Sequence, residues 1–256
     1  MQNRKNQLDA GRQKMKICVV QTRPFKGDVE RNIERHKRLI DLAVSNGAET
    51  IIFPELSLTG YEPELAKELA TDPSDSRFDD FQRMSDTRQV TVGVGAPVKS
   101  DNGICIGMIL FQPHKARQLY SKKYLHSDEE PFFVSGRSSI EFLGDETGVA
   151  LAICYELTVP AHAARAARSG ARVYIASAAK SASGVEKAFE RLSEIASRYS
   201  MLVLMSNCVG PCDNFESAGQ SAVWNEEGLL LAQLNDTNEG LLIFDTDTRE
   251  LVESRA

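Results

Sequence analysis

The chain has 256 residues, 42% of them hydrophobic and 26% charged, with a formal net charge of -6 at pH 7. This length and apolar content are enough to bury a sizeable core. The acidic balance argues against nucleic-acid binding, because contact with phosphates requires a basic surface. The opening residues are charged and lack the apolar stretch of a signal peptide, and no uncharged apolar run approaches the length of a membrane span. We therefore expect a cytoplasmic protein with neither nucleic-acid nor membrane partners.

The five cysteines are odd in number and mostly occupy apolar segments, unlike the disulfide framework of a secreted protein. We expect reduced thiols. Cys208 and Cys212 have a Cys-x-x-x-Cys spacing, but no second cysteine or histidine pair has a metal-binding spacing. This pattern predicts one core thiol and one loop thiol, with no metal site.

Apolar patterns typical of strands and helices alternate along the chain. We expect residues 1–14 to be loosely ordered and residues 15–256 to form one domain, because no linker or repeat divides them. The first strand is expected at 16–20, followed by a helix that Asp28 caps and Gly47 ends. Further strands are predicted at 50–53, 90–96, 104–111, 149–154, 173–176, 202–208 and 229–234, and helices at 161–169 and 185–199.

The order of these elements indicates an α/β fold. The opening strand, helix and strand are typical of layered α/β proteins. The runs at 90–96 and 104–111 flank a Ser-Asp-Asn-Gly sequence, which predicts an antiparallel hairpin. A mixed β-sheet follows from these two features.

Two polar side chains stand at the ends of predicted strands, where ligands gather in α/β sheets. Glu55 follows Pro54, and apolar surroundings would raise its pKa to that of a general base. The alternative is an ordinary loop carboxylate. Cys154 ends an apolar strand before a helix, where backbone N–H groups would favour a nucleophilic thiolate. The alternative is a small buried hydrophobe, which we expect for Cys18, Cys105 and Cys208.

The third candidate segment contains Lys122 and Lys123, followed by the acidic residues 128–130. A lysine pair beside acidic residues is usually a solvated surface feature. Close to a thiolate, one lysine would instead stabilise the thiolate and a developing oxyanion.

We expect surface or capping roles for His36, His114 and His162, and a core position for Trp224.

The three segments together resemble the nitrilase, or carbon–nitrogen hydrolase, superfamily. The resemblance extends from Lys16 to about Thr248. It rests on Phe53-Pro54-Glu55-Leu56, Thr59-Gly60-Tyr61, Tyr120-Ser121-Lys122, Ile153-Cys154-Tyr155-Glu156, Ser206-Asn207-Cys208-Val209-Gly210, and Gly219-Gln220-Ser221-Ala222-Val223-Trp224 with Gly228. It implies an α-β-β-α sandwich with two mixed β-sheets.

The same resemblance implies a set of catalytic residues. Glu55 is expected as general base, Lys122 as electrostatic stabiliser and Cys154 as nucleophile. A second glutamate is expected between the lysine and Gly136, and its distance from this glycine favours Glu129 over Glu130.

The resemblance also implies the reaction, which is cofactor-independent hydrolysis of a small amide through a cysteine thioester. Ammonia is released, and the substrate and water are the small-molecule partners. Lys122 and the backbone N–H of Tyr155 would hold the oxyanion. Substrate contacts are expected from Tyr61, Tyr155 and His126, and a homodimer or larger homo-oligomer is expected.

Two alternatives stay open at this point. An N-carbamoyl amino acid or amine hydrolase would use the same Glu-Lys-Cys trio, and a catalytically silent binding or scaffold protein could share the fold. Glu156 stands where many related amidases carry aspartate, and Thr158 where they often carry arginine. The exact substrate therefore does not follow from the resemblance.

Overall fold

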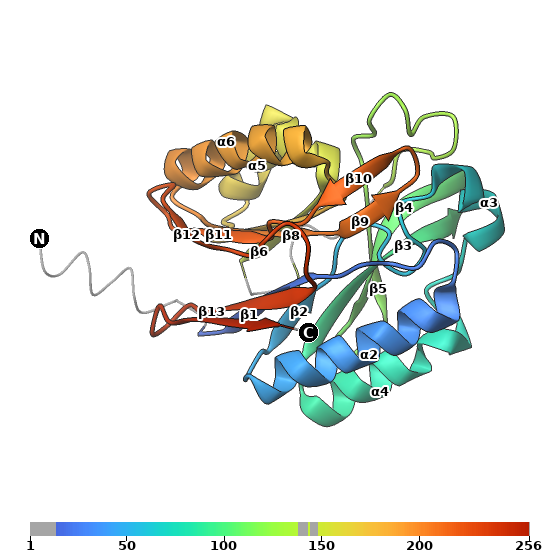
Figure 1. Cartoon of the computed structure of the whole chain (residues 1–256), viewed down its shortest axis with the longest axis horizontal. Coiled ribbons are helices and arrows are strands. Elements are labelled where there is room, and N and C mark those ends of the chain that lie inside the picture. Colours follow the sequence, from blue (N-terminus) through green and yellow to red (C-terminus); the bar gives the residue numbers. More distant parts are fainter. Residues whose placement is uncertain (1–13, 138–142, 144–147, 256) are drawn as a thin grey trace, which may run out of the picture.

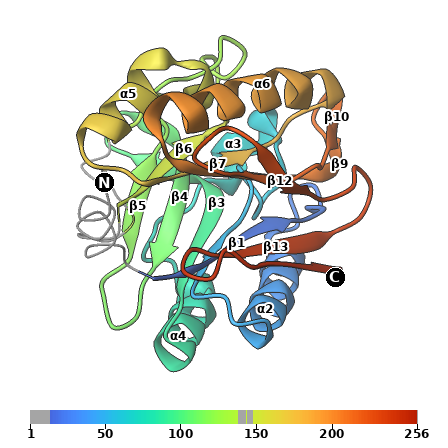
Figure 2. The ribbon, with the colours of Figure 1, turned by 90° about the vertical axis from the view of Figure 1, so that its left-hand side faces the viewer.

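The computed structural model describes residues 14–137, 143 and 148–255. Two β-sheets lie face to face in it, and helices cover their outer faces (Figures 1 and 2). The larger sheet has the strand order β14-β13-β1-β2-β3-β4-β5 and the smaller sheet has the order β12-β11-β8-β7-β6. Helices α2 and α4 cover the first sheet, and α5 and α6 cover the second (Figure 1). The expected α-β-β-α sandwich is confirmed.

The strands of the larger sheet are β1 (Lys16–Gln21), β2 (Thr50–Ile52), β3 (Thr91–Ser100), β4 (Gly103–Phe111), β5 (Gln118–Ser121), β13 (Gly240–Asp245) and β14 (Leu251–Arg255). Those of the smaller sheet are β6 (Val149–Ile153), β7 (Val173–Ala178), β8 (Leu202–Asn207), β11 (Ala222–Trp224) and β12 (Leu230–Gln233). Strands β9 (Val209–Cys212) and β10 (Phe215–Ala218) form a separate hairpin.

The helices are α2 (Val29–Ser45), α3 (Ala66–Leu69), α4 (Asp79–Arg88), α5 (Pro160–Arg168) and α6 (Ala182–Tyr199). The described ranges also contain the short 3-10 segments η1 (Pro63–Leu65), η2 (Ser76–Phe78) and η3 (Cys154–Thr158). Helix α2 begins where predicted, because the Asp28 side chain accepts a hydrogen bond from the Arg31 amide at 3.1 Å. Among the described residues, no helix combines the length and the apolar character that a bilayer crossing requires.

Both sheets are mixed. Strands β1, β2 and β3 run parallel, while β13, β14, β4 and β5 join this group by antiparallel pairing. In the smaller sheet, β6, β7 and β8 are parallel and β11 and β12 are antiparallel. The predicted hairpin is confirmed, with β3 and β4 paired from Val92 opposite Phe111 to Ser100 opposite Gly103.

The central strands are buried on both faces, which is why they are apolar without interruption. In β1, Ile17 and Val19 pack between the two sheets, while Cys18 and Val20 pack under α2. This two-residue alternation places each side chain in one of two separate cores. Trp224 is also buried, as expected.

The structure corrects the surface role expected for His36. Its imidazole is buried and stacks on Phe53 with ring centroids 4.1 Å apart. Its ring nitrogens lie 2.7 Å from the Asn32 carbonyl oxygen and 2.9 Å from Ser57 Oγ. Burial lowers the pKa of His36 to about 4, so the ring is neutral near pH 7.

The loop position expected for Cys212 is also wrong. Cys212 is a buried residue of β9 and packs with Cys208 in a small apolar cluster. Cys212 thus belongs to the β9-β10 hairpin, which was absent from the predicted elements.

Candidate active site

Three chain segments meet at one buried cluster between the sheets. Glu55 follows β2, Lys122 follows β5 and Cys154 follows β6. Lys122 Nζ donates hydrogen bonds to Glu55 Oε1 at 2.7 Å and to Glu129 Oε1 at 2.6 Å. The side chains of Glu55, Lys122 and Glu129 are at most 1% exposed. The structure therefore places one cation between two buried carboxylates.

Two glycines allow the close backbone approach that forms this cluster. A Cβ atom on Gly95 would lie 2.4 Å from Leu56 N, in the turn that carries Glu55. A Cβ atom on Gly136 would lie 2.3 Å from Ser121 Cβ and 2.8 Å from the Lys122 carbonyl oxygen. Side chains at either position would push a cluster residue out of place.

Glu129 is fixed by contacts other than Lys122. Its Oε1 also accepts a hydrogen bond from the Tyr61 hydroxyl at 2.9 Å, and its Oε2 accepts one from the His126 amide at 2.8 Å. Glu130, the other glutamate considered, is exposed. Of these two, Glu129 is thus the residue in contact with Lys122.

Cys154 stands at a strained turn between β6 and η3. Its φ angle of 43° is in the left-handed region, which non-glycine residues seldom occupy. Its Sγ lies 3.9 Å from the Ala179 carbonyl oxygen. The predicted strand therefore ends one residue earlier than expected, and the thiol is the first side chain of the turn.

Glu156 ties the turn of Cys154 to the segment of Lys122. Its Oε2 accepts hydrogen bonds from the Ile153 amide at 2.8 Å and from the Tyr120 hydroxyl at 2.7 Å. Its Oε1 accepts one from the Lys123 amide at 2.7 Å. One buried carboxylate thus bonds to neighbours of both catalytic candidates.

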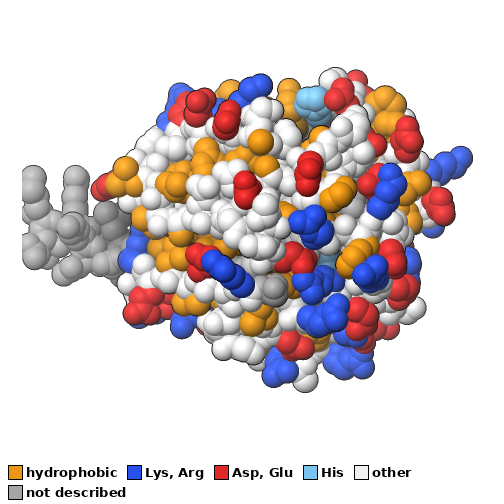
Figure 3. All heavy atoms as spheres, in the orientation of Figure 1, with side chains coloured by type: hydrophobic (Ala, Val, Ile, Leu, Met, Phe, Trp, Pro, Cys, Tyr) orange, Lys and Arg blue, Asp and Glu red, His pale blue; other side chains and the backbone are white. Residues whose placement is uncertain are grey.

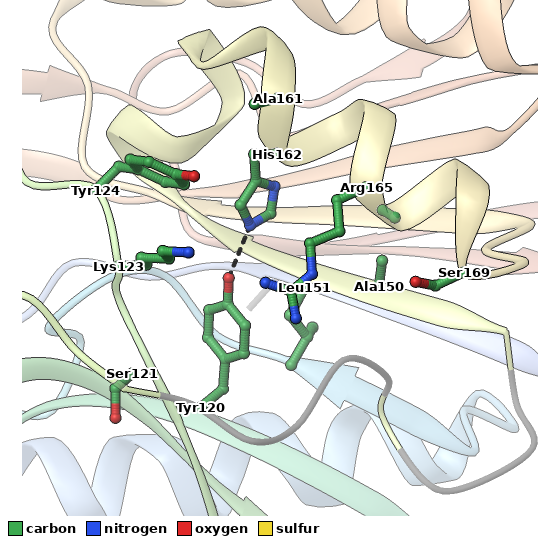
Figure 4. A pocket seen from close by; sticks show the side chains of 11 residues that line it. Tyr120, Ser121, Lys123, Tyr124, Ala150, Leu151, Ala161, His162, Arg165 and Ser169 are labelled. Atoms are coloured by element: carbon green, nitrogen blue, oxygen red, sulfur yellow. Dashed lines mark hydrogen bonds between the residues drawn. The ribbon is translucent and has the colours of Figure 1, made fainter.

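The expected surface or capping role of His162 is also corrected. Its ring nitrogens lie 2.9 Å from both the Tyr120 and the Tyr174 hydroxyl oxygens, and its side chain is 14% exposed. Figure 4 shows His162 reaching from α5 toward Tyr120, above a small hollow also lined by Lys123 and Arg165. His162 therefore supports the Tyr120–Glu156 contact from behind the cluster.

Electrostatics set the resting protonation of the cluster. Burial raises the pKa of Glu55, against the opposing effect of Lys122. Burial and the Glu55 charge raise the pKa of Cys154, against smaller opposing effects of Lys180 and Lys122. Burial lowers the pKa of Lys122, but the neighbouring anionic groups outweigh burial and raise it. The resting site therefore holds a lysine cation and a protonated thiol, rather than the thiolate that the turn alone suggested.

The Glu55 carboxylate lies next to that thiol. Glu55 Oε2 is buried and makes no hydrogen bond of normal geometry to any residue in the described part of the chain. The Cys154 thiol nonetheless acts on the Glu55 carboxylate and favours its charged form. A carboxylate that can accept a proton thus lies beside a thiol that can donate one.

A cavity of about 480 Å³ opens beside Cys154. Among the residues that line it are Tyr61, His126, Glu129, Cys154, Tyr155 and Lys180. His126 and Tyr155 meet edge to face, with ring centroids 5.3 Å apart. The hollow behind the cluster, of about 70 Å³, is much smaller.

The sequence model of the carbon-nitrogen hydrolase family matches residues 16–256. The chain belongs to the carbon–nitrogen hydrolase family. It is similar to the hydrolase in the agr operon of Staphylococcus aureus, with 27% identity over 248 residues and 94% of each chain covered. It is also 28% identical to the glutamine-dependent NAD(+) synthetase of Aquifex aeolicus, over 90% of this chain and 42% of the synthetase.

Solved structures of an amidase from Nesterenkonia sp. AN1 have the same fold. The structure in complex with butyramide superposes with a TM-score of 0.81, at 21% identity and with 92% of each chain covered. Another structure of that amidase shows covalent addition of the acetamide moiety of fluoroacetamide at its active site cysteine. This carbon–nitrogen hydrolase thus shares the nitrilase-superfamily sandwich.

All seven site residues selected from the sequence of this carbon–nitrogen hydrolase lie at one place. Glu55 and Lys122 lie behind the cavity, and the other five line it. Within the described ranges, no group of three or more His, Cys, Asp or Glu side chains is arranged to hold a metal ion.

Sequence reasoning missed two polar residues of the site, Glu156 as a structural tie and Lys180 as part of the cavity wall. Lys180 follows the carboxyl end of β7 by two residues. That position is the same signal that selected Glu55, and it could have identified Lys180.

Proposed function

We propose that this carbon–nitrogen hydrolase cleaves the C–N bond of a small amide through a thioester on Cys154 and releases ammonia. The observation that carries the proposal is the Lys122 cation, held between two buried carboxylates next to a cysteine that faces a cavity. Such an arrangement suits nucleophilic catalysis, because it supplies a base and an electrostatic stabiliser beside the nucleophile.

In the first step, Glu55 removes the proton from Cys154. The proton moves from one buried group to another, so the total charge of the cluster does not change. This transfer avoids adding an uncompensated charge to a buried cluster, which would be costly. The raised pKa of Glu55 supports this role, because it brings the carboxylate closer to the working pH of a general base.

The Cys154 sulfur then forms a bond to the substrate carbonyl carbon, and the carbonyl π electrons move to oxygen. Lys122 and the backbone N–H of Tyr155 stabilise this oxyanion. Glu55 returns its proton to the substrate nitrogen, the C–N bond breaks, and ammonia leaves. The acyl group remains on Cys154 as a thioester.

Water completes the reaction. Glu55 takes a proton from a water molecule while the water oxygen forms a bond to the thioester carbon. The C–S bond then breaks. The sulfur regains a proton from Glu55, and the carboxylic acid leaves. Each turnover thus consumes one amide and one water, and releases one acid and one ammonia.

Glu129 acts as a tether for Lys122 in this scheme. Glu55 changes protonation state twice per half-reaction, so its hydrogen bond to Lys122 changes in strength. Glu129 is held by Tyr61 and by the His126 amide, and it keeps the lysine in place throughout. Tyr61, Tyr155 and His126 contact the substrate from the cavity wall.

The relatives support an amide substrate. The Nesterenkonia amidase binds butyramide, and the Aquifex synthetase is glutamine-dependent. A carboxamide is the chemical group common to butyramide and glutamine.

The test is ammonia release from ω-amides, aliphatic amides and N-carbamoyl amino acids. We expect release from amides that disappears in Cys154→Ala and persists in Cys105→Ala, a buried thiol of β4 outside the cluster. Equal ammonia release by wild type and Cys154→Ala would refute the role of Cys154 as nucleophile. Ammonia release from N-carbamoyl compounds alone would favour the N-carbamoyl hydrolase. No release from any compound, together with an unreactive Cys154 thiol, would favour a catalytically silent scaffold protein.

A further inference from the structure

Lys180 lies beside the proposed nucleophile but outside the Glu55–Lys122–Glu129 cluster. It lines the cavity with Cys154, and the preceding residue, Ala179, supplies the carbonyl oxygen 3.9 Å from Cys154 Sγ. The charge of Lys180 favours the thiolate form of Cys154, so its electric field reaches the reacting sulfur. A substrate acylating Cys154 therefore comes within the range of this cation.

The backbone of Lys180 is held rigidly. Its amide donates to Asn207 Oδ1 at 2.9 Å. Its carbonyl oxygen accepts hydrogen bonds from the Ala218 amide at 2.9 Å and from Ser217 Oγ at 3.1 Å. Strands β8 and β10 thus fix the point from which the lysine side chain extends, which limits the entropy lost when it binds a ligand.

The ammonium group of Lys180 differs from that of Lys122. Lys122 Nζ contacts two carboxylates, whereas Lys180 Nζ makes no hydrogen bond or ion pair with any residue that the structure describes. Lys180 is half-buried, so its charge is less screened than a surface charge. A half-buried cation in a ligand cavity is complementary to an anion.

The other charged groups around the cavity do not supply that anion. Glu129 is engaged by Lys122 and Tyr61. Glu64, Asp128 and Asp213 line the cavity, but all three are exposed at its rim, where water screens them.

We propose that Lys180 binds a carboxylate of the substrate, so that the enzyme prefers small amides whose acyl chain ends in a carboxylate over neutral amides of equal length. The inference rests on the proposed function in taking Cys154 as the residue that the substrate acylates. An ionic hydrogen bond of this kind corresponds to a preference on the order of 10- to 100-fold.

The first experiment does not depend on turnover. Cys154 is alkylated with iodoacetate, which carries a carboxylate, and with iodoacetamide, which is neutral, and mass spectrometry gives the two rates. An effect of Lys180 on thiol ionisation changes both rates equally, so their ratio isolates recognition of the carboxylate.

We expect the iodoacetate to iodoacetamide ratio to fall about tenfold in Lys180→Met and to be retained in Lys180→Arg. Lys187→Met serves as the matched control, because Lys187 is an exposed lysine of the neighbouring helix α6. The same ratio in wild type and in Lys180→Met would overturn the proposal, whether or not any amide is hydrolysed.

The second experiment compares the monoamides of succinic and glutaric acid with butyramide and valeramide. In Lys180→Met we expect kcat/KM to fall 10- to 100-fold for the two acids, mainly through KM, and less than threefold for the neutral amides. An equal fall for both classes would mean that Lys180 acts on the thiol, and it would overturn the proposal. Absence of turnover with an intact alkylation ratio would count against the hydrolase assignment and not against Lys180.

Discussion

Replacing Lys122 by methionine should be strongly destabilising. Methionine has a similar length, so the substitution removes the charge with little change in volume. Two carboxylate contacts, at 2.7 and 2.6 Å, are lost in a site that is at most 1% exposed. Removing one partner of a buried ion pair costs about 3–5 kcal/mol, and the loss of two contacts places the expected cost near the upper end.

The cost should also depend on pH. Lys122 lowers the pKa of Glu55 in the folded protein, while burial raises it above 4.5, the value of an unperturbed glutamate. Without Lys122, the folded-state pKa of Glu55 rises further. A raised carboxylate pKa means that stability is lost as pH rises above 4.5, by up to about 1.4 kcal/mol per pH unit. Wild type and Lys122→Met lose stability in parallel until the pH passes the folded-state pKa of Glu55 in wild type. The difference between them should therefore grow above that pH and be smallest in acid.

Urea unfolding, followed by circular dichroism between pH 4 and 8, would measure this difference. Lys123→Met is the matched control, because Lys123 is exposed and its side chain lies outside the cluster. The double variant Lys122→Met/Glu129→Gln should recover part of the loss, since it buries one anion fewer. A destabilisation below about 1 kcal/mol, or one that does not change with pH, would refute the reasoning.

Three further predictions concern the base, the packing and the buried histidine. Glu55→Gln should lower ammonia release at least about 100-fold and leave the near-UV circular dichroism unchanged; near-normal release would exclude Glu55 as the base. Gly136→Ala should destabilise the chain by more than about 2 kcal/mol, because the added Cβ would lie 2.3 Å from Ser121 Cβ; a neutral effect in urea unfolding would contradict this packing. The pKa of His36 is lowered to about 4, so the folded state resists its protonation and roughly 3 kcal/mol of stability should be lost between pH 6.5 and 4. His36→Gln should flatten this pH dependence, and an unchanged profile would show that other groups cause it.

Sequence patterns predicted the parts of the site that have a local signal. Glu55 and Cys154 each stand at the end of an apolar strand, and Lys122 stands in a short segment that resembles the family. The pattern could not assign Glu156, because its role depends on the Tyr120 hydroxyl, 36 residues earlier. It assigned surface or capping roles to His36 and His162 from their places in predicted helices, because the buried groups that their rings contact come into reach only in the folded chain.

The sequence by itself established the layered α/β class and the order of the first elements. It did so through its apolar strands, its helix caps and its family resemblance. These features depend on residues that are close in the chain. Only the tertiary structure decided the paired carboxylates around Lys122, the protonated thiol of Cys154 and the charge of Lys180, which is unpaired among the described residues. Burial, close approach and electrostatic coupling arise between segments far apart in the chain, and they exist only once the two sheets have packed together.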